Sequence, residues 1–93
     1  MLSSVTKSTR RDKKYVAEFT DGTRIHFGGA GYDDYTTFPA DIRDEKRRLY
    51  RLRHGGDRLN SPRTAGALSY YLLWGDTADL SENIRAFKKR FKV

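Results

Sequence analysis

Residues 61–75 read SPRTAGALSYYLLWG, the only long apolar run in an otherwise polar chain. Ser61 is a residue type that caps a helix, because its side-chain oxygen accepts a hydrogen bond from the free N–H groups of the first turn. Proline fits the first helical position, which Pro62 would occupy. Gly75 can adopt the left-handed conformation that ends many helices. These signals predict an α-helix over residues 62–74.

Apolar side chains cover two sides of this predicted helix. One face carries Ala65, Leu68 and Leu72, and the other carries Ala67, Tyr70, Tyr71 and Trp74. A surface helix has one apolar stripe, so two stripes imply neighbours on both sides. The helix would be roughly 20 Å long, which is too short to cross a membrane. We expect it to form the buried centre of the fold, although the aromatic residues of its second face could instead meet a partner.

The chain is short, basic and free of cysteine. Its 93 residues fit one domain with a modest core. The absence of cysteine excludes disulfides and thiolate metal sites, and it fits a reducing compartment. The formal net charge is +7, and the positive charge is concentrated in residues 1–14, 39–58 and 80–93. This pattern favours polyanions or acidic protein surfaces as partners, with solubility alone as the other explanation.

Residues 1–14 are interpreted as a basic N-terminal arm, and residues 15–93 as a single α+β domain. The arm alternates Ser, Thr, Lys and Arg, with Leu2 and Val5 as its apolar points, so it cannot build a core. We expect it to be mobile in the isolated chain and ordered by a partner. It contains no apolar run of signal-peptide length, so nothing in it suggests secretion.

Residues 15–19 and 23–27 alternate in the manner of two strands, and an Asp-Gly pair between them indicates a hairpin. A two-residue loop would mix polar and apolar side chains on each face. A three-residue loop with Gly22 left-handed would gather the apolar residues on one face, namely Tyr15, Ala17, Phe19, Ile25 and Phe27. Burial selects the three-residue loop, and this face must lie on a helix because a lone hairpin is marginal.

Residues 28–39 read GGAGYDDYTTFP, in which three aromatic residues closely follow three glycines. No lysine follows in P-loop order and the dinucleotide-binding spacing is missing, while Asp33 and Asp34 would repel a phosphate. We therefore expect no nucleotide site here. The prediction is a loop folded over the core by Tyr32, Tyr35 and Phe38, with the adjacent acids as turn or surface residues.

A basic helix is predicted over residues 42–54, capped by Asp41 and ended by Gly55-Gly56. Basic side chains surround its thin apolar stripe, at Arg43, Lys46, Arg47, Arg48, Arg51 and Arg53. These charges mark either a nucleic-acid-binding face or an ordinary solvated surface.

A final helix is predicted over residues 80–92, with Asp79 as its cap and Glu82 at the capping-box position. Apolar residues recur on one face, at Leu80, Ile84, Phe87 and Phe91. Its basic end is available to a partner. The expected fold is therefore α+β, with one β-hairpin packed on three α-helices around a central apolar helix.

No catalytic or metal-binding constellation stands out. His26 and His54 are the only histidines, and neither has a metal-ligand spacing or a neighbouring nucleophile motif. We expect a protein without catalytic residues, cofactor or metal.

From about Lys13 to Phe91, the chain resembles a known group of proteins. The resemblance rests on the hairpin, the Gly-rich loop with Tyr32-Asp33-Asp34-Tyr35, the basic helix ending at Arg53-His54, and the segment from Thr64-Ala65-Gly66 to Trp74-Gly75. This set is similar to a family of short, basic, uncharacterised proteins encoded by large double-stranded DNA viruses of algae and protists (nucleocytoplasmic large DNA viruses, chlorovirus-like). The family has no assigned activity, so the resemblance implies a context and no catalytic residues.

That context implies a non-enzymatic viral structural protein, such as a minor capsid component. It would reside in the virion, and in the host cytoplasm during assembly, and would tie together shell proteins with acidic surfaces. The alternative is a genome-associated nucleic-acid-binding protein, and self-association stays open. The candidate partner-binding residues are Arg10, Arg11, Lys13, Lys14, Tyr32, Tyr35, Arg47, Arg51, Lys88, Lys89 and Arg90.

Overall fold

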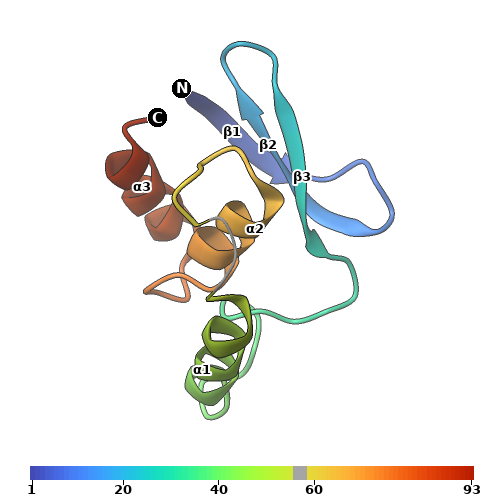
Figure 1. Cartoon of the computed structure of the whole chain (residues 1–93). Helices are drawn as coiled ribbons and strands as arrows, with labels where there is room; N and C mark the ends of the chain where they lie inside the picture. The colour runs from blue at the N-terminus through green and yellow to red at the C-terminus, as the bar shows by residue number, and fades with distance from the viewer. Residues whose placement is uncertain (56–58) are drawn as a thin grey trace.

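The computed structural model describes residues 1–55 and 59–93, and the fold is α+β, as predicted. Three strands form one antiparallel sheet in the order β1-β2-β3. Helical segments lie against one side of the sheet, while α1 lies farthest from it (Figure 1). The elements are β1 (Leu2–Lys7), β2 (Lys13–Phe19), β3 (Arg24–Gly29), α1 (Arg43–His54), α2 (Ala65–Leu68), the π-helix η1 (Ser69–Leu73) and α3 (Leu80–Phe91).

The predicted hairpin register is confirmed. Tyr15 pairs with Phe27 and Ala17 pairs with Ile25, so the loop spans residues 20–22. Gly22 has a φ of +90°, in the left-handed region. Since a slip of one residue would turn every apolar side chain to the wrong face, burial specifies this register.

The prediction of a separate basic arm over residues 1–14 is wrong, because residues 2–7 form the edge strand β1. Leu2 lies opposite Phe19 and is buried, and Val5 lies opposite Ala17 and packs against the core. The pairing register shifts between Leu2 and Ser4. Such a bulge inserts one extra residue and brings two side chains three positions apart onto the same face. That irregular spacing hid the strand from period-two alternation.

The predicted single α-helix over residues 62–74 is also corrected. The α-helix begins at Ala65, where the Thr64 hydroxyl rather than Ser61 accepts the capping hydrogen bond from the Ala67 N–H. From Ser69 to Leu73 the chain winds as a π-helix, and the Trp74 N–H donates to the Ser69 carbonyl.

Gly75 is needed for close packing and not for a left-handed turn. Its φ angle is not positive, unlike those of Gly22, Gly28 and Gly31. A Cβ atom at this position would lie 2.3 Å from the Tyr71 carbonyl oxygen and 2.8 Å from the side chain of Asn83.

The core lies between the sheet and the segments α2 and η1. Its fully buried large apolar side chains come from the sheet, from this segment and from α3, namely Phe19, Phe27, Leu68, Leu72, Leu73 and Phe87. Asp79 caps α3 as predicted, accepting from the Ser81 and Glu82 N–H groups. Leu80, Ile84 and Phe91 are partly buried against the core.

Helix α1 is attached differently, because none of its residues is buried. Asp41 does not cap it: Ile42 occupies that position, without a side-chain hydrogen bond, and the Pro39 carbonyl accepts from the Ile42 and Arg43 N–H groups. The helix ends at His54, followed by Gly55 in right-handed conformation. The predicted stop at Gly56 lies outside the described residues.

Exchange of Gly22 for valine should destabilise the protein by about 1–2 kcal/mol, because a β-branched residue resists the left-handed conformation. No atom lies within 4 Å of a Cβ built there, so the loss would be conformational and not steric. The measurement is the free energy of unfolding in a urea titration. Gly22→Asn is the matched control and should lose clearly less, since asparagine tolerates positive φ; equal losses for both variants would contradict the register.

Exchange of the buried Asn83 for alanine should cost about 1–3 kcal/mol, because it leaves buried polar groups unpaired. The Asn83 amide donates to the carbonyl oxygens of Leu72 and Thr77, each at 2.9 Å. The exposed Ser81, on the same helix, provides the control Ser81→Ala. Chemical denaturation should separate the two variants by at least about 1 kcal/mol; indistinguishable stabilities would remove the role assigned to Asn83.

Candidate functional site

A cleft of about 540 Å³ lies between α1, the loop that follows β3, and the segment α2–η1. In Figure 1 the long connection from β3 swings outward before it returns to α1. The cleft is lined by Lys13, Lys14, Gly28, Gly29, Tyr32, Asp33, Asp34, Phe38, Lys46, Leu49, Tyr50, Arg53, His54, Ala65, Gly66, Ser69, Leu73 and Trp74.

Asp34 organises the loop wall of the cleft. It is only 2% exposed, and its carboxylate accepts hydrogen bonds from the Lys14 ammonium at 2.5 Å and from the Thr36 N–H at 2.8 Å. The Asp34 N–H donates to the Thr37 hydroxyl. The adjacent acids are predicted to be turn or surface residues: Asp33 is exposed, and Asp34 is a buried turn residue whose carbonyl accepts from the Thr37 and Phe38 N–H groups. A buried carboxylate needs such partners, and this one neutralises Lys14.

Tyr32 does not fold over the core, in contrast to the prediction. Its side chain is 77% exposed, whereas Tyr35 and Phe38 do pack against the core. The Tyr32 ring rests on Gly29: a Cβ atom at Gly29 would lie 2.9 Å from the ring atom Cδ2. Glycine therefore leaves the space in which this ring is seated at the mouth of the cleft.

Aromatic rings form the opposite wall. The Tyr50 ring stacks on Trp74, with centroids 4.4 Å apart and ring planes inclined by 6°, and its neighbour His54 lies 4.3 Å from it. Phe38 lies 6.0 Å from Trp74, and the Lys46 ammonium lies over the Phe38 ring. These contacts tie α1 to the loop and to the end of η1.

Arg47 and Arg51, both predicted to bind a partner, bind carbonyl groups of the chain itself. The Arg47 guanidinium donates to the carbonyls of Trp74 and Gly75 and to the Asp76 carboxylate. Arg51 donates twice to the Trp74 carbonyl. The last carbonyls of a helix have no intrahelical partner, so these side chains complete the hydrogen bonding of η1.

Three cations that line the cleft, Lys13, Lys46 and Arg53, have no carboxylate partner within residues 1–55 and 59–93. Lys13 comes from β2, where it pairs with Gly29, the residue on which the Tyr32 ring rests. Lys46 and Arg53 come from the opposite wall. Their seven-residue separation, two helical turns, was the sequence signal that they share a face of α1.

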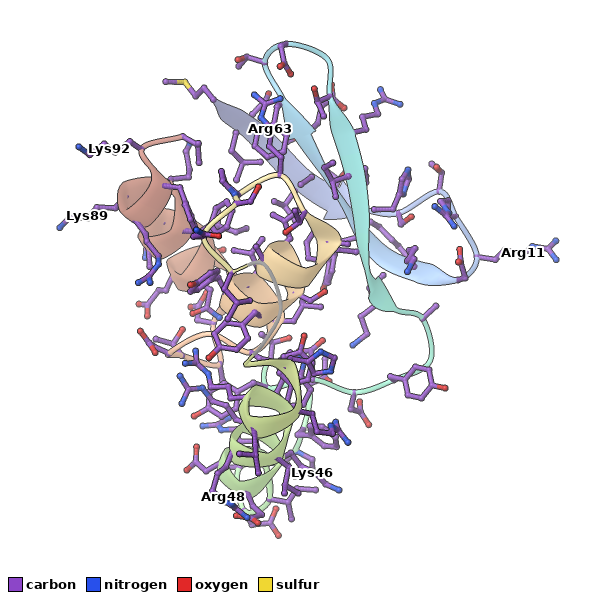
Figure 2. The ribbon with its side chains drawn as sticks, viewed as in Figure 1. Arg11, Lys46, Arg48, Arg63, Lys89 and Lys92 are labelled. Atoms are coloured by element: carbon purple, nitrogen blue, oxygen red, sulfur yellow. The ribbon has the colours of Figure 1, made fainter. Side chains whose placement is uncertain are left out.

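The other predicted partner-binding residues lie outside the cleft. Arg10 pairs with Asp12, and Arg11 points into solvent at the far end of the sheet (Figure 2). Lys88, Lys89 and Arg90 occupy the end of α3, where Arg90 lies over the rings of Tyr71 and Phe91. The structure thus brings Lys13, Lys14 and Tyr32 together at one site. No sequence signal indicated that Asp34 and Tyr50 also belong to it.

The cleft combines aromatic side chains with basic ones. No group of three or more potential ligands that could hold a metal ion occurs in the described part of the chain. No helix among the described residues is long and apolar enough to cross a membrane.

The hydrogen bond from the Tyr35 hydroxyl to the Asp44 carboxylate, 2.6 Å long, raises the pKa of Tyr35 above its usual 10.0. Because the folded state holds this proton more tightly than the unfolded state, the bond contributes stability below pH 10 that is lost as the pH rises through the folded pKa. The stability difference between the wild type and Tyr35→Phe should accordingly shrink above pH 10, as measured by urea titration at several pH values. Leu52→Ala, which changes an exposed side chain without a titrating group, should show no such dependence; a difference for Tyr35→Phe that is constant with pH would refute the bond.

One comparison with known proteins gives a match, and it covers residues 3–54. That segment contains the sheet, the loop and α1, and hence most of the cleft lining. No curated protein and no solved structure shows a significant match. Because the match covers more than half of the chain, the protein belongs to the family of unknown function DUF5754.

Proposed function

We propose that the protein is a non-catalytic nucleic-acid-binding protein and that the cleft is its principal contact surface. The observation that supports this function is a set of cations, Lys13, Lys46 and Arg53, that have no carboxylate partner among the described residues and line a cleft that also contains aromatic rings. Side-chain cations that are not neutralised within the fold are available to phosphates, and their binding releases counterions from the nucleic acid.

The remaining surface charge fits the same function. The net charge is +7, and exposed basic residues such as Arg11, Lys89 and Lys92 project from several sides of the molecule (Figure 2). These charges would attract a polyanion over a distance of several ångströms, while the cleft would hold it. We expect little base-sequence preference, because the cleft contains no Asn or Gln side chain to pair with base edges.

The cleft needs a rigid support, and we propose that the apolar segment 65–74 is the central element that supplies it. Ala67, Leu68 and Leu72 in this segment are fully buried. Leu73 and Trp74 both line the cleft.

A structural role in a viral particle is the second candidate, and it follows from the family resemblance of the sequence. The protein would then reside in the virion, and in the host cytoplasm during assembly, bound to acidic shell proteins. The basic end of α3, with Lys88, Lys89 and Lys92, is the feature that favours it. A free tethering arm is no longer part of this proposal, because residues 2–7 belong to the sheet. The discriminating observation is whether the protein is stoichiometric in purified particles, and whether it separates with shell or genome.

Binding of a fluorescently labelled oligonucleotide should weaken steeply with salt, and Lys46→Ala should weaken it further. Loss of one phosphate contact should reduce the slope of log affinity against log salt by about 0.7–0.9. Fluorescence anisotropy between about 50 and 200 mM salt measures both quantities.

The matched control is Arg48→Ala, which removes the same charge from the same helix. Arg48 is paired with Glu45 and does not line the cleft. It should therefore change the salt slope less than Lys46→Ala does. Absence of any binding at about 50 mM salt, or equal effects of the two variants, would reject the proposed function of the cleft.

A further inference from the structure

We propose that the cleft takes an unpaired base of a single-stranded nucleic acid, and that Tyr32 is the platform on which this base stacks. The inference rests on the proposed function and names the class of nucleic acid that the site selects. It starts from the most unusual residue of the cleft, a large aromatic side chain that is 77% exposed although the neighbouring rings are packed.

Tyr32 is exposed and yet held in place. Gly29 leaves the space against which the ring rests, and the Tyr32 N–H donates to the Gly29 carbonyl, closing a tight turn. Asp34, two residues further on, is anchored by Lys14 and by the Thr36 N–H. A ring with restricted motion loses little conformational entropy when a flat partner stacks on it, which is the usual basis of base recognition on protein surfaces.

The charges around Tyr32 determine how a strand would lie. Lys13 of β2 pairs with Gly29, against which the Tyr32 ring rests, and Lys46 and Arg53 line the same cleft from α1. The exposed Asp33 follows Tyr32 directly and would repel a phosphate. A base stacked on Tyr32 would direct its neighbouring phosphates toward Lys13 on one side and toward Lys46 and Arg53 of α1 on the other. The phosphates would then meet cations rather than the Asp33 carboxylate.

The same geometry disfavours a duplex. Bases in a duplex are stacked on each other and show only their edges in the grooves, so no ring face is free for Tyr32. The volume of about 540 Å³ is in the range of small-ligand sites, which suits one or two nucleotides. The basic side chains alone would bind both duplex and single-stranded nucleic acid, whereas stacking of a base on Tyr32 favours the single strand.

The experiment compares four ligands of equal length with the full chain at about 50 mM salt. They are a single-stranded oligonucleotide, its duplex, a strand in which abasic sites replace the bases, and polyglutamate. Fluorescence anisotropy gives the affinities for the wild type, Tyr32→Ala, Tyr32→Phe and the control Leu52→Ala. Leu52 is 75% exposed on α1 and does not line the cleft.

Tyr32→Ala should lose about tenfold in affinity for the single strand and nothing for the duplex or the abasic strand. Tyr32→Phe, which keeps the ring, and Leu52→Ala should bind the single strand within about twofold of the wild type. Gly29→Val should reproduce the loss of Tyr32→Ala, because its side chain displaces the ring.

Two results would overturn the inference while leaving the proposed function intact. In one, Tyr32→Ala weakens all nucleic-acid ligands equally or none of them; in the other, the wild type binds the abasic strand as tightly as the normal strand. Polyglutamate bound as tightly as the single strand would overturn it in favour of an acidic protein partner. Absence of binding to every nucleic acid would instead reject the proposed function itself.

Discussion

The fold depends on how the carbonyl groups at the end of η1 are satisfied. A helix leaves its last carbonyls without intrahelical partners, and here the residues that carry them, 72–75, are buried. Asn83 of α3 donates to Leu72, the Tyr35 N–H of the loop donates to Leu73, and Arg47 and Arg51 of α1 donate to Trp74 and Gly75. Four groups from three parts of the chain thus converge on one helix end, and each fixes the position of the element that carries it.

The cleft follows from this mode of attachment. Helix α1 buries no side chain and is held by its arginines and by the Tyr50–Trp74 stack. The face of α1 that carries Lys46 and Arg53 lines the cleft, although the Lys46 ammonium also lies over the Phe38 ring. A helix packed by an ordinary apolar stripe would have closed this space. The polar attachment of α1 therefore both stabilises the fold and leaves a charged cavity beside it.

Basic residues of this chain have two different roles, and only their environment separates them. Lys14, Arg47 and Arg51 meet a buried carboxylate or backbone carbonyls, so their charge is used within the fold. Lys13 and Lys46 have no such partner among the described residues and face the cleft. The first group would contribute mainly stability, and the second group is the one that a polyanion could reach. Net charge alone does not distinguish them.

Local patterns in the sequence were sufficient for the hairpin register, the Asp79 cap and the α+β class, because each depends on neighbouring residues or on simple periodicity. Strand β1 escaped prediction because its bulge breaks the two-residue alternation of apolar side chains, and the burial of Asp34 because it depends on Lys14, from a different part of the chain. No propensity signal distinguished the π-helix over residues 69–73 from an ordinary α-helix. The sequence likewise indicated which residues are basic or aromatic, but not which share a site. Tertiary packing alone decided that Tyr32 stays exposed on Gly29 and that Arg47 turns inward, because only the assembled fold supplies the surfaces and carbonyl groups for which these side chains compete.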